Sequence, residues 1–122
     1  MGMYTELFFS AEFKDKLSDV DEAAVQFLFG NAERPQEVPK HSFFERSRAY
    51  WMFNSPRYAG PGVSLKIGDY YRQVTAHIEI KNYEGEIEAF LDWVRPLLDN
   101  SAGTCIGWTW YEEDDNPTLI YA

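Results

Sequence analysis

The sequence predicts one α+β domain over residues 1–122, with two amphipathic helices on one face of a mostly antiparallel sheet of about five or six strands. Three observations predict this class. Several segments alternate apolar and polar residues, as strands with one buried face do. Two segments repeat apolar residues at helical spacing. The elements follow the order β-α-β-β-β-α-β-β, and the polar alternate face of the strands predicts that the helices cover only one side of the sheet.

The first part of the chain predicts a strand and then a helix. Residues 4–13 alternate so that one face of the strand is clearly apolar, with Leu7, Phe9, Ala11 and Phe13 beside Thr5. A helix is expected from about 19 to 29, since Ser18 and Asp21 have capping-box spacing and Gly30 is a natural C-cap. Residues 31–42 carry two prolines and no periodicity, which indicates a loop.

The middle of the chain predicts three more strands. Residues 48–55, RAYWMFNS, are rich in aromatic residues, which favours a second strand. Residues 62–81 contain two alternating runs around Gly68 and Asp69, and this pattern is typical of a hairpin.

The last part predicts the second helix and the last two strands. Residues 84–98 repeat apolar residues at helical spacing, and Pro96 is expected to kink or shorten the end of this helix. Residues 104–113 and 117–122 are β-rich, and the turn sequence DDNP separates them.

Composition excludes several classes of protein. Hydrophobic residues make up 45% of the chain and aromatic residues 17%, which is ample for a core and excludes wholesale disorder. A single cysteine excludes an internal disulfide and a multi-cysteine zinc site, and it suggests a reducing, cytoplasmic setting. We find no signal peptide and no apolar run long enough to span a membrane. We expect Met1 and Gly2 to be a cloning extension and Met3 the native start.

The charge of the chain either favours basic partners or only keeps the protein soluble. Eleven basic and twenty acidic residues give a net charge of −9, which repels nucleic acid and anionic membranes. Residues 34–72 hold seven basic and three acidic residues, a net charge of +4, whereas the remainder holds four basic and seventeen acidic residues, a net charge of −13. We therefore expect an acidic side and a mildly basic patch.

A run of four acids is the first candidate binding segment. It follows three aromatic residues at the connection between the last two predicted strands, and the set comprises Trp108, Trp110, Tyr111, Glu112, Glu113, Asp114 and Asp115. The acids either keep a hairpin tip in water or contact a basic protein partner, with the aromatic rings as anchors. Trp108 and Trp110 share one face by alternation, and we expect at least one of them to lie in the core.

The middle segment offers an alternative site for an anionic small molecule such as a nucleotide. Its arginines are interspersed with Tyr50, Trp51 and Tyr58, so guanidinium groups could bind a phosphate while rings stack on a base. The residues are Arg46, Arg48, Arg57, Tyr50 and Tyr58. The competing interpretation places the aromatic rings in the core and pairs the arginines with acids.

The sequence contains no catalytic motif, and we expect neither an enzyme nor a bound metal or cofactor. His77 and Glu79 share one face of a strand, but the only other histidine, His41, lies in a predicted loop, and a metal normally needs three or four ligands. We expect His77 to form a plain cross-strand polar pair. Cys105 begins a predicted strand, where we expect it to be buried.

Four segments of the chain resemble a family of small proteins encoded in bacteriophages and prophages. They are MYTELFFSAEFK, HSFFERSR, KNYEGEIEAFLDWVRPLL and YEEDDNPTLIYA, which together cover much of the chain. No activity comes with that family, so the resemblance implies no catalytic residues. It implies a context in a bacterial host cell, in which small accessory proteins bind and block host factors as anti-defence inhibitors or sequester small molecules.

The expected function is therefore a non-enzymatic, acidic binding protein that docks on a basic protein surface as an inhibitor or adaptor. A nuclease-toxin immunity protein would share the same features, and a protein that sequesters an anionic small molecule is the alternative. The run TLIYA, residues 118–122, is short and apolar, so we expect an edge strand and a homodimer.

Overall fold

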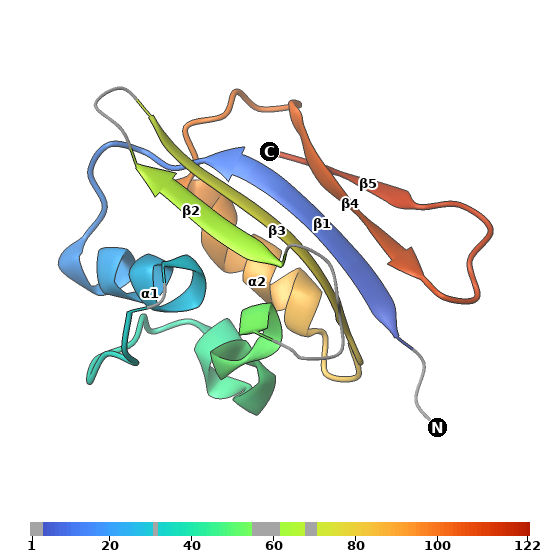
Figure 1. Cartoon of the computed structure of the whole chain (residues 1–122), viewed down its shortest axis with the longest axis horizontal. Helices are drawn as coiled ribbons and strands as arrows, with labels where there is room; N and C mark the ends of the chain where they lie inside the picture. The colour runs from blue at the N-terminus through green and yellow to red at the C-terminus, as the bar shows by residue number, and fades with distance from the viewer. Residues whose placement is uncertain (1–3, 31, 55–61, 68–70) are drawn as a thin grey trace.

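The computed structural model describes residues 4–30, 32–54, 62–67 and 71–122. Their strands form one antiparallel sheet with the order β2-β3-β1-β4-β5, and two α-helices accompany it (Figure 1), so the predicted fold class is confirmed. The strands are β1 Thr5–Glu12, β2 Val63–Ile67, β3 Arg72–Ile80, β4 Cys105–Tyr111 and β5 Thr118–Tyr121. The helices are α1 Asp19–Phe29 and α2 Glu86–Val94, and the short 3₁₀ turns are η1 Ser42–Glu45, η2 Ser47–Tyr50, η3 Met52–Asn54 and η4 Arg95–Leu97.

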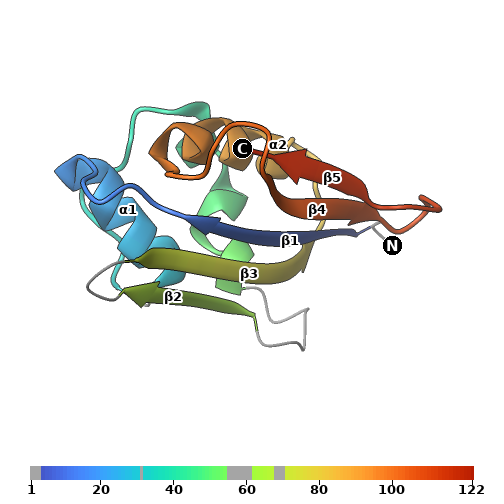
Figure 2. The same ribbon diagram turned by 90° about the horizontal axis from the view of Figure 1, so that it is seen from above.

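The N-terminal strand β1 is the centre of the sheet. It pairs antiparallel with β3 on one side and with β4 on the other. Figure 2 shows the strands following one another in this order, with β2 at one edge and β5 at the other. The prediction that the run TLIYA forms an edge strand is therefore confirmed.

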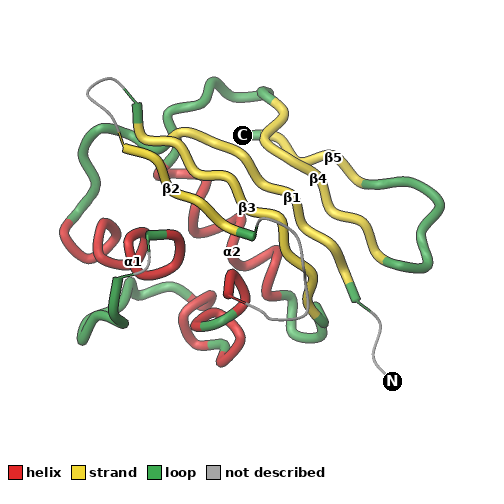
Figure 3. Tube along the Cα trace, viewed as in Figure 1, coloured by secondary structure: helices red, strands yellow, loops and turns green. Residues whose placement is uncertain are grey.

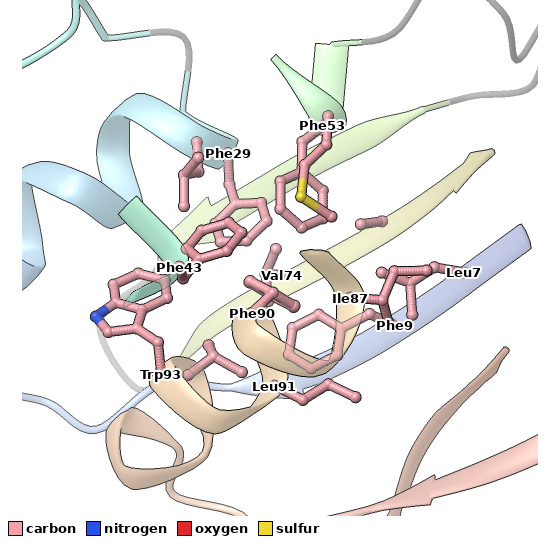
Figure 4. Packing of buried hydrophobic residues seen from close by; sticks show 14 of the residues in the cluster. Leu7, Phe9, Phe29, Phe43, Phe53, Val74, Ile87, Phe90, Leu91 and Trp93 are labelled. Atoms are coloured by element: carbon pink, nitrogen blue, oxygen red, sulfur yellow. The ribbon is translucent and has the colours of Figure 1, made fainter. Parts of the chain in front are cut away.

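Both helices pack on the same face of the sheet. The alternate residues Leu7, Phe9 and Ala11 of β1 are buried in the same cluster as Phe29 of α1 and Phe90 of α2. In Figure 1, α2 lies behind β1 and β3. The ring of Phe90 meets that of Phe9 edge-on, with 5.2 Å between the ring centroids (Figure 4). The opposite face of the sheet, to which Phe8 and His77 point by alternation, is called the open face below.

The helix boundaries follow local sequence signals. The Ser18 side chain accepts a hydrogen bond from the backbone N–H of Asp21 at 3.1 Å, which caps α1 as the spacing predicted. Gly30 ends α1, as expected. The second helix ends at Val94, and the chain continues through the 3₁₀ turn that contains Pro96, so the proline shortens the helix. Among the described residues, no helix is long and apolar enough to cross a membrane.

The prediction of a strand at residues 48–55 is wrong. Residues 42–54 form the three 3₁₀ turns η1 to η3, and Figure 3 shows this segment coiled. Ala49, Met52 and Phe53 are buried while Trp51 and Asn54 are exposed, a spacing close to three rather than two. Burial of these side chains against α2 and β3 therefore overrides the β propensity of the aromatic run. Residue 55 lies outside the described residues.

The prediction of a buried Cys105 is also wrong. The thiol is exposed at the start of β4. A β-bulge between Cys105 and Gly107 shifts the pairing of β4 with β5 by one residue. The extra residue turns Ile106, which is 1% exposed, into the core and leaves Cys105 outside.

Candidate protein-binding face

A row of aromatic side chains, joined at the β5 edge by a leucine, crosses the open face at the centre of the sheet. Phe8 on β1 lies opposite His77 on β3 and Trp108 on β4, and Leu119 on β5 lies opposite Trp108. The Phe8 ring stacks on the Trp108 indole with 5.9 Å between centroids. Trp110, the next residue of β4 on this face, meets Trp108 edge-on at 6.2 Å. This set of Phe8, His77, Trp108, Trp110 and Leu119 is called the aromatic row below.

The bulge in β4 puts both tryptophans on the open face. Ile106, Trp108 and Trp110 are alternate residues, so a regular strand that buries Ile106 would bury the tryptophans too. The bulge reverses the alternation at Gly107, whose φ is +156°. A Cβ at Gly107 would lie 2.0 Å from the Phe8 carbonyl oxygen, so the two backbones approach closely there.

The expectation that at least one of these tryptophans lies in the core is therefore wrong. Trp110 is 38% exposed and Trp108 is half-buried on the open face. The buried tryptophan is Trp93 of α2.

His77 is held within the aromatic row by a cross-strand bond. Its Nε2 lies 2.8 Å from Oε1 of Glu6, which is on β1. The imidazole also meets the Trp108 indole edge-on, with 5.6 Å between centroids. The prediction of a cross-strand polar pair is confirmed, and the partner in this bond is Glu6 rather than Glu79.

A hollow of about 410 Å³ adjoins the aromatic row at the end of the sheet where β1 begins and β4 ends. Four carboxylates and two aromatic rings line it: Glu6, Glu79, Glu112, Asp114, Tyr4 and Trp110. The ammonium group of Lys81 lies 5.5 Å from the centre of the Tyr4 ring, so a cation of the chain itself already occupies one face of this ring. The hollow thus combines negative charge with aromatic surface.

The acidic run contributes unevenly to this end of the sheet. The Glu112 carboxylate accepts a hydrogen bond from the Tyr4 N–H, and the Glu112 N–H donates to the Tyr4 carbonyl at 3.1 Å. The Trp110 indole N–H donates to the Asp114 carbonyl at 2.9 Å. Glu113 and Asp115 are exposed in the connection between β4 and β5. Glu112 therefore ties this connection to β1, and the other carboxylates face solvent.

Tyr111 lies beside the acidic run on the helix side of β4. Partial burial and the negative charges of Glu113 and Glu112 raise the pKa of its phenol above the ordinary value of 10.0, with smaller contributions from Tyr83 and Asp114. The carboxylates of Glu112, Glu113 and Asp114 thus add negative potential at this end of the sheet, although burial is the larger cause of the raised pKa. Such a potential attracts a cationic partner.

The two described arginines of the alternative site, Arg46 and Arg48, are already engaged. Arg48 pairs with the fully buried Glu86 at 3.0 Å from Nη1 to Oε2. Arg46 donates to the carbonyls of Glu84 and Ser42 at 2.8 and 2.7 Å. An anion would have to displace these partners.

Tyr50, the described tyrosine of that alternative site, does not offer a free ring face. The Tyr50 hydroxyl donates to the Phe44 carbonyl at 2.7 Å, and the Arg34 guanidinium lies 3.7 Å from the centre of the Tyr50 ring. Arg57 and Tyr58 lie outside the described residues. The described part of the site therefore offers little that favours an anionic ligand.

Sequence patterns alone did not identify Tyr4, Glu6 and Phe8 as site residues. Their alternation placed them on the polar side of the first strand, which is the open face. The missing information was the pairing partner: β1 lies between β3 and β4, and this non-local pairing brings Phe8 against Trp108.

Within the described ranges, no group of three or more histidine, cysteine, aspartate or glutamate side chains is placed to hold a metal ion. Comparison with known proteins adds no relative: no family model, no curated protein and no solved structure matches the chain.

Proposed function

We propose that this protein is a non-enzymatic binding protein that docks its open face on a basic surface of another protein, as an inhibitor or adaptor. The observation that carries the proposal is the aromatic row beside a hollow lined by four carboxylates. Aromatic rings are the usual energetic anchors of interfaces, and complementary charge steers the encounter and selects the partner.

The exposed apolar surface of the row is the first support. Leu119 is 51% exposed and Trp110 is 38% exposed, and both flank Trp108 on the open face. Contiguous apolar patches of this kind, rimmed by polar groups, mark interaction sites. The Trp108 indole is held by its stacking on Phe8, and the imidazole of His77 is held by its bond to Glu6, so these two side chains lose little conformational entropy on docking.

The charge around the row favours a basic partner over a second copy of the chain. In a two-fold pairing of two open faces, the carboxylates of Glu6, Glu112 and Asp114 would approach those of the other copy. Like charges brought together at an interface cost several kcal/mol. Lysine or arginine side chains of a partner would instead enter the hollow, between Trp110 and the carboxylates.

Two biological roles fit this surface. One is an inhibitor of the phage type that blocks a host factor, and the other is an immunity protein that covers the basic substrate site of a nuclease toxin. Both need a preformed acidic face with aromatic anchors, and the identity of the partner distinguishes them.

A capture experiment with matched tryptophan variants tests the proposal. The tagged protein is incubated with bacterial lysate at low salt and at about 500 mM salt, where screening shortens the Debye length to a few ångströms. We expect basic proteins to be captured at low salt and lost at high salt. The Trp110→Ala variant should lose them, and Trp51→Ala, which removes an exposed indole outside the open face, should keep them. Captured proteins that do not depend on Trp110, or none at low salt, would contradict the proposal.

A further inference from the structure

A second hollow, of about 700 Å³, lies in the helical layer on the other side of the sheet from the open face. Three segments form it: the start of α1, residues 37–41, and the end of α2 with η4. It is called the helical groove below. Its volume is within the range of sites that bind small molecules.

Two side-chain bonds hold the walls of the helical groove at a fixed spacing. The Trp93 indole N–H donates to Oδ1 of Asp21 at 3.2 Å, which joins α2 to α1. Nε2 of His41 lies 2.8 Å from Oδ2 of Asp92, which joins residues 37–41 to α2. The groove is therefore formed before any ligand arrives.

Two hydrogen bonds fix the orientation of the His41 ring at the wall of the groove. Its Nδ1 accepts a hydrogen bond from the Phe43 N–H at 3.0 Å, so this nitrogen carries no proton. The ring proton is on Nε2 and is donated to Asp92. The Asp92 carboxylate that accepts this bond is 81% exposed at the mouth of the groove, so its oxygens are accessible from solvent.

The remaining lining combines apolar surface with net negative charge. The apolar side chains are Val20, Val38, Pro39, Trp93, Pro96 and Leu97. The charged groups are the carboxylates of Asp21, Glu37 and Asp92 and a single ammonium group, that of Lys40. An anion would be repelled here, and a neutral apolar molecule would leave the carboxylates unused.

We propose that the helical groove binds a small organic cation with an apolar body, of the arylalkylamine type. The ammonium group donates charge-assisted hydrogen bonds to the exposed oxygens of Asp92, while the apolar body packs on Leu97, Pro96 and Val38. This site is independent of the open face: it uses other residues, and its ligand is a small molecule rather than a protein.

Nuclear magnetic resonance of the indole N–H groups tests the proposal. The Trp93 indole signal, identified by its loss in Trp93→Phe, reports on the groove because the Asp21 bond holds this N–H at its wall. Titration with phenethylamine should shift this signal in a saturable way, with a Kd in the millimolar range or tighter. Titration with 3-phenylpropionate, which has a similar body and the opposite charge, should not shift it.

Two carboxylate variants complete the test. Asp92→Asn keeps an oxygen that accepts from His41, so the fold is retained, but it should weaken phenethylamine binding about three- to fivefold, as expected for an exposed ion pair. Asp115→Asn removes a charge from the β4–β5 connection and should leave binding unchanged. No shift of the Trp93 signal at about 10 mM amine, equal binding of the carboxylate probe, or unchanged affinity in Asp92→Asn would each overturn the proposal.

Discussion

The Phe8 ring and the Trp108 indole stack on the open face with 5.9 Å between their centroids and 21° between their planes. The two residues are a hundred positions apart in the chain and meet because β4 pairs with β1. This contact lies in the middle of the aromatic row, so the orientation of the Trp108 indole on the open face depends on Phe8.

Truncation of the open-face tryptophans should affect binding more than folding. We expect Trp110→Ala to cost less than about 1 kcal/mol of unfolding free energy and Trp108→Ala about 1–2 kcal/mol, because stacked rings contribute about 0.5–1.5 kcal/mol beyond their burial. Phe90→Ala, in the core, should cost roughly 3–5 kcal/mol. Urea denaturation measures all three. A loss for Trp110→Ala as large as that for Phe90→Ala would show that the indole is structural.

Loss of the Arg48–Glu86 pair should lower the unfolding free energy more than loss of the Arg46 contacts. Glu86 is fully buried, and Arg48→Met would leave its carboxylate without a cation. We expect a loss of roughly 2–4 kcal/mol, below the full range for buried pairs because the Arg48 side chain is 24% exposed. Arg46→Met is the matched control: it removes bonds to backbone carbonyls alone and should cost about 1 kcal/mol. Equal losses in thermal or urea unfolding would contradict this account.

Neutral variants of the acidic run should show that Glu112 contributes to stability and that the other three carboxylates do not. The triple variant Glu113→Gln, Asp114→Asn, Asp115→Asn should leave the unfolding free energy within about 0.5 kcal/mol. Glu112→Gln weakens a bond to the Tyr4 N–H at the surface and should cost up to about 1 kcal/mol. Once a basic protein partner is identified, the triple variant should bind it with a lower association rate and a weaker salt dependence of that rate. A triple variant that does not fold would show that the whole run is structural.

The phenol of Tyr111 should titrate above its ordinary range, and neutral neighbours should lower its pKa. The difference between absorbance titrations of the native chain and of Tyr111→Phe isolates this group. In the Glu112→Gln, Glu113→Gln background the curve should move to lower pH, because two of the raising charges are gone. A folded-state pKa above the unfolded value of 10.0 means that the folded chain binds the proton more tightly. The contribution of the Tyr111 phenol to the unfolding free energy is therefore complete below pH 10, and it is lost as the pH rises through the folded-state pKa of this phenol. An unmoved curve would show that burial alone sets the pKa.

Replacement of Gly107 should be among the most damaging single changes in β4. In Gly107→Ala the new methyl group would meet the Phe8 carbonyl oxygen at 2.0 Å in a backbone conformation that favours glycine. We expect a loss of at least about 2–3 kcal/mol, or rearrangement of the strand. Gly103→Ala is the control: its φ of +88° also favours glycine, but nothing lies within 4 Å of the added Cβ. If both variants lose the same stability, the close approach to Phe8 is unimportant.

Most elements of the fold could be predicted because their signals are local. The alternation of residues 4–13, the capping of α1 by Ser18 and the helical spacing in α2 each depend on neighbours in the chain. The predictions for residues 48–55 and for Cys105 were wrong because tertiary contacts decide these two structures. Burial against α2 and β3 coils the aromatic segment into 3₁₀ turns. A β-bulge in β4 turns Cys105 outward.

The candidate site could be predicted only in part for the same reason. The sequence placed the aromatic and acidic residues of β4 and its connection at one end of a hairpin, and the structure agrees. That Glu6 and Phe8 join them depends on the pairing of β1 with β3 and β4. The side on which Trp108 and Trp110 emerge depends on one inserted residue.

The close approach at Gly107 also fixes the register of β4 against β1 when the strands pair. If β4 slid along β1 by one residue in either direction, Ile106 or Trp108 would occupy the position where a Cβ lies 2.0 Å from the Phe8 carbonyl oxygen. Either slip would also turn the remaining side chains of β4 to the opposite face. The chain thus excludes by steric overlap the two nearest misaligned pairings of a strand whose tryptophans would otherwise favour burial.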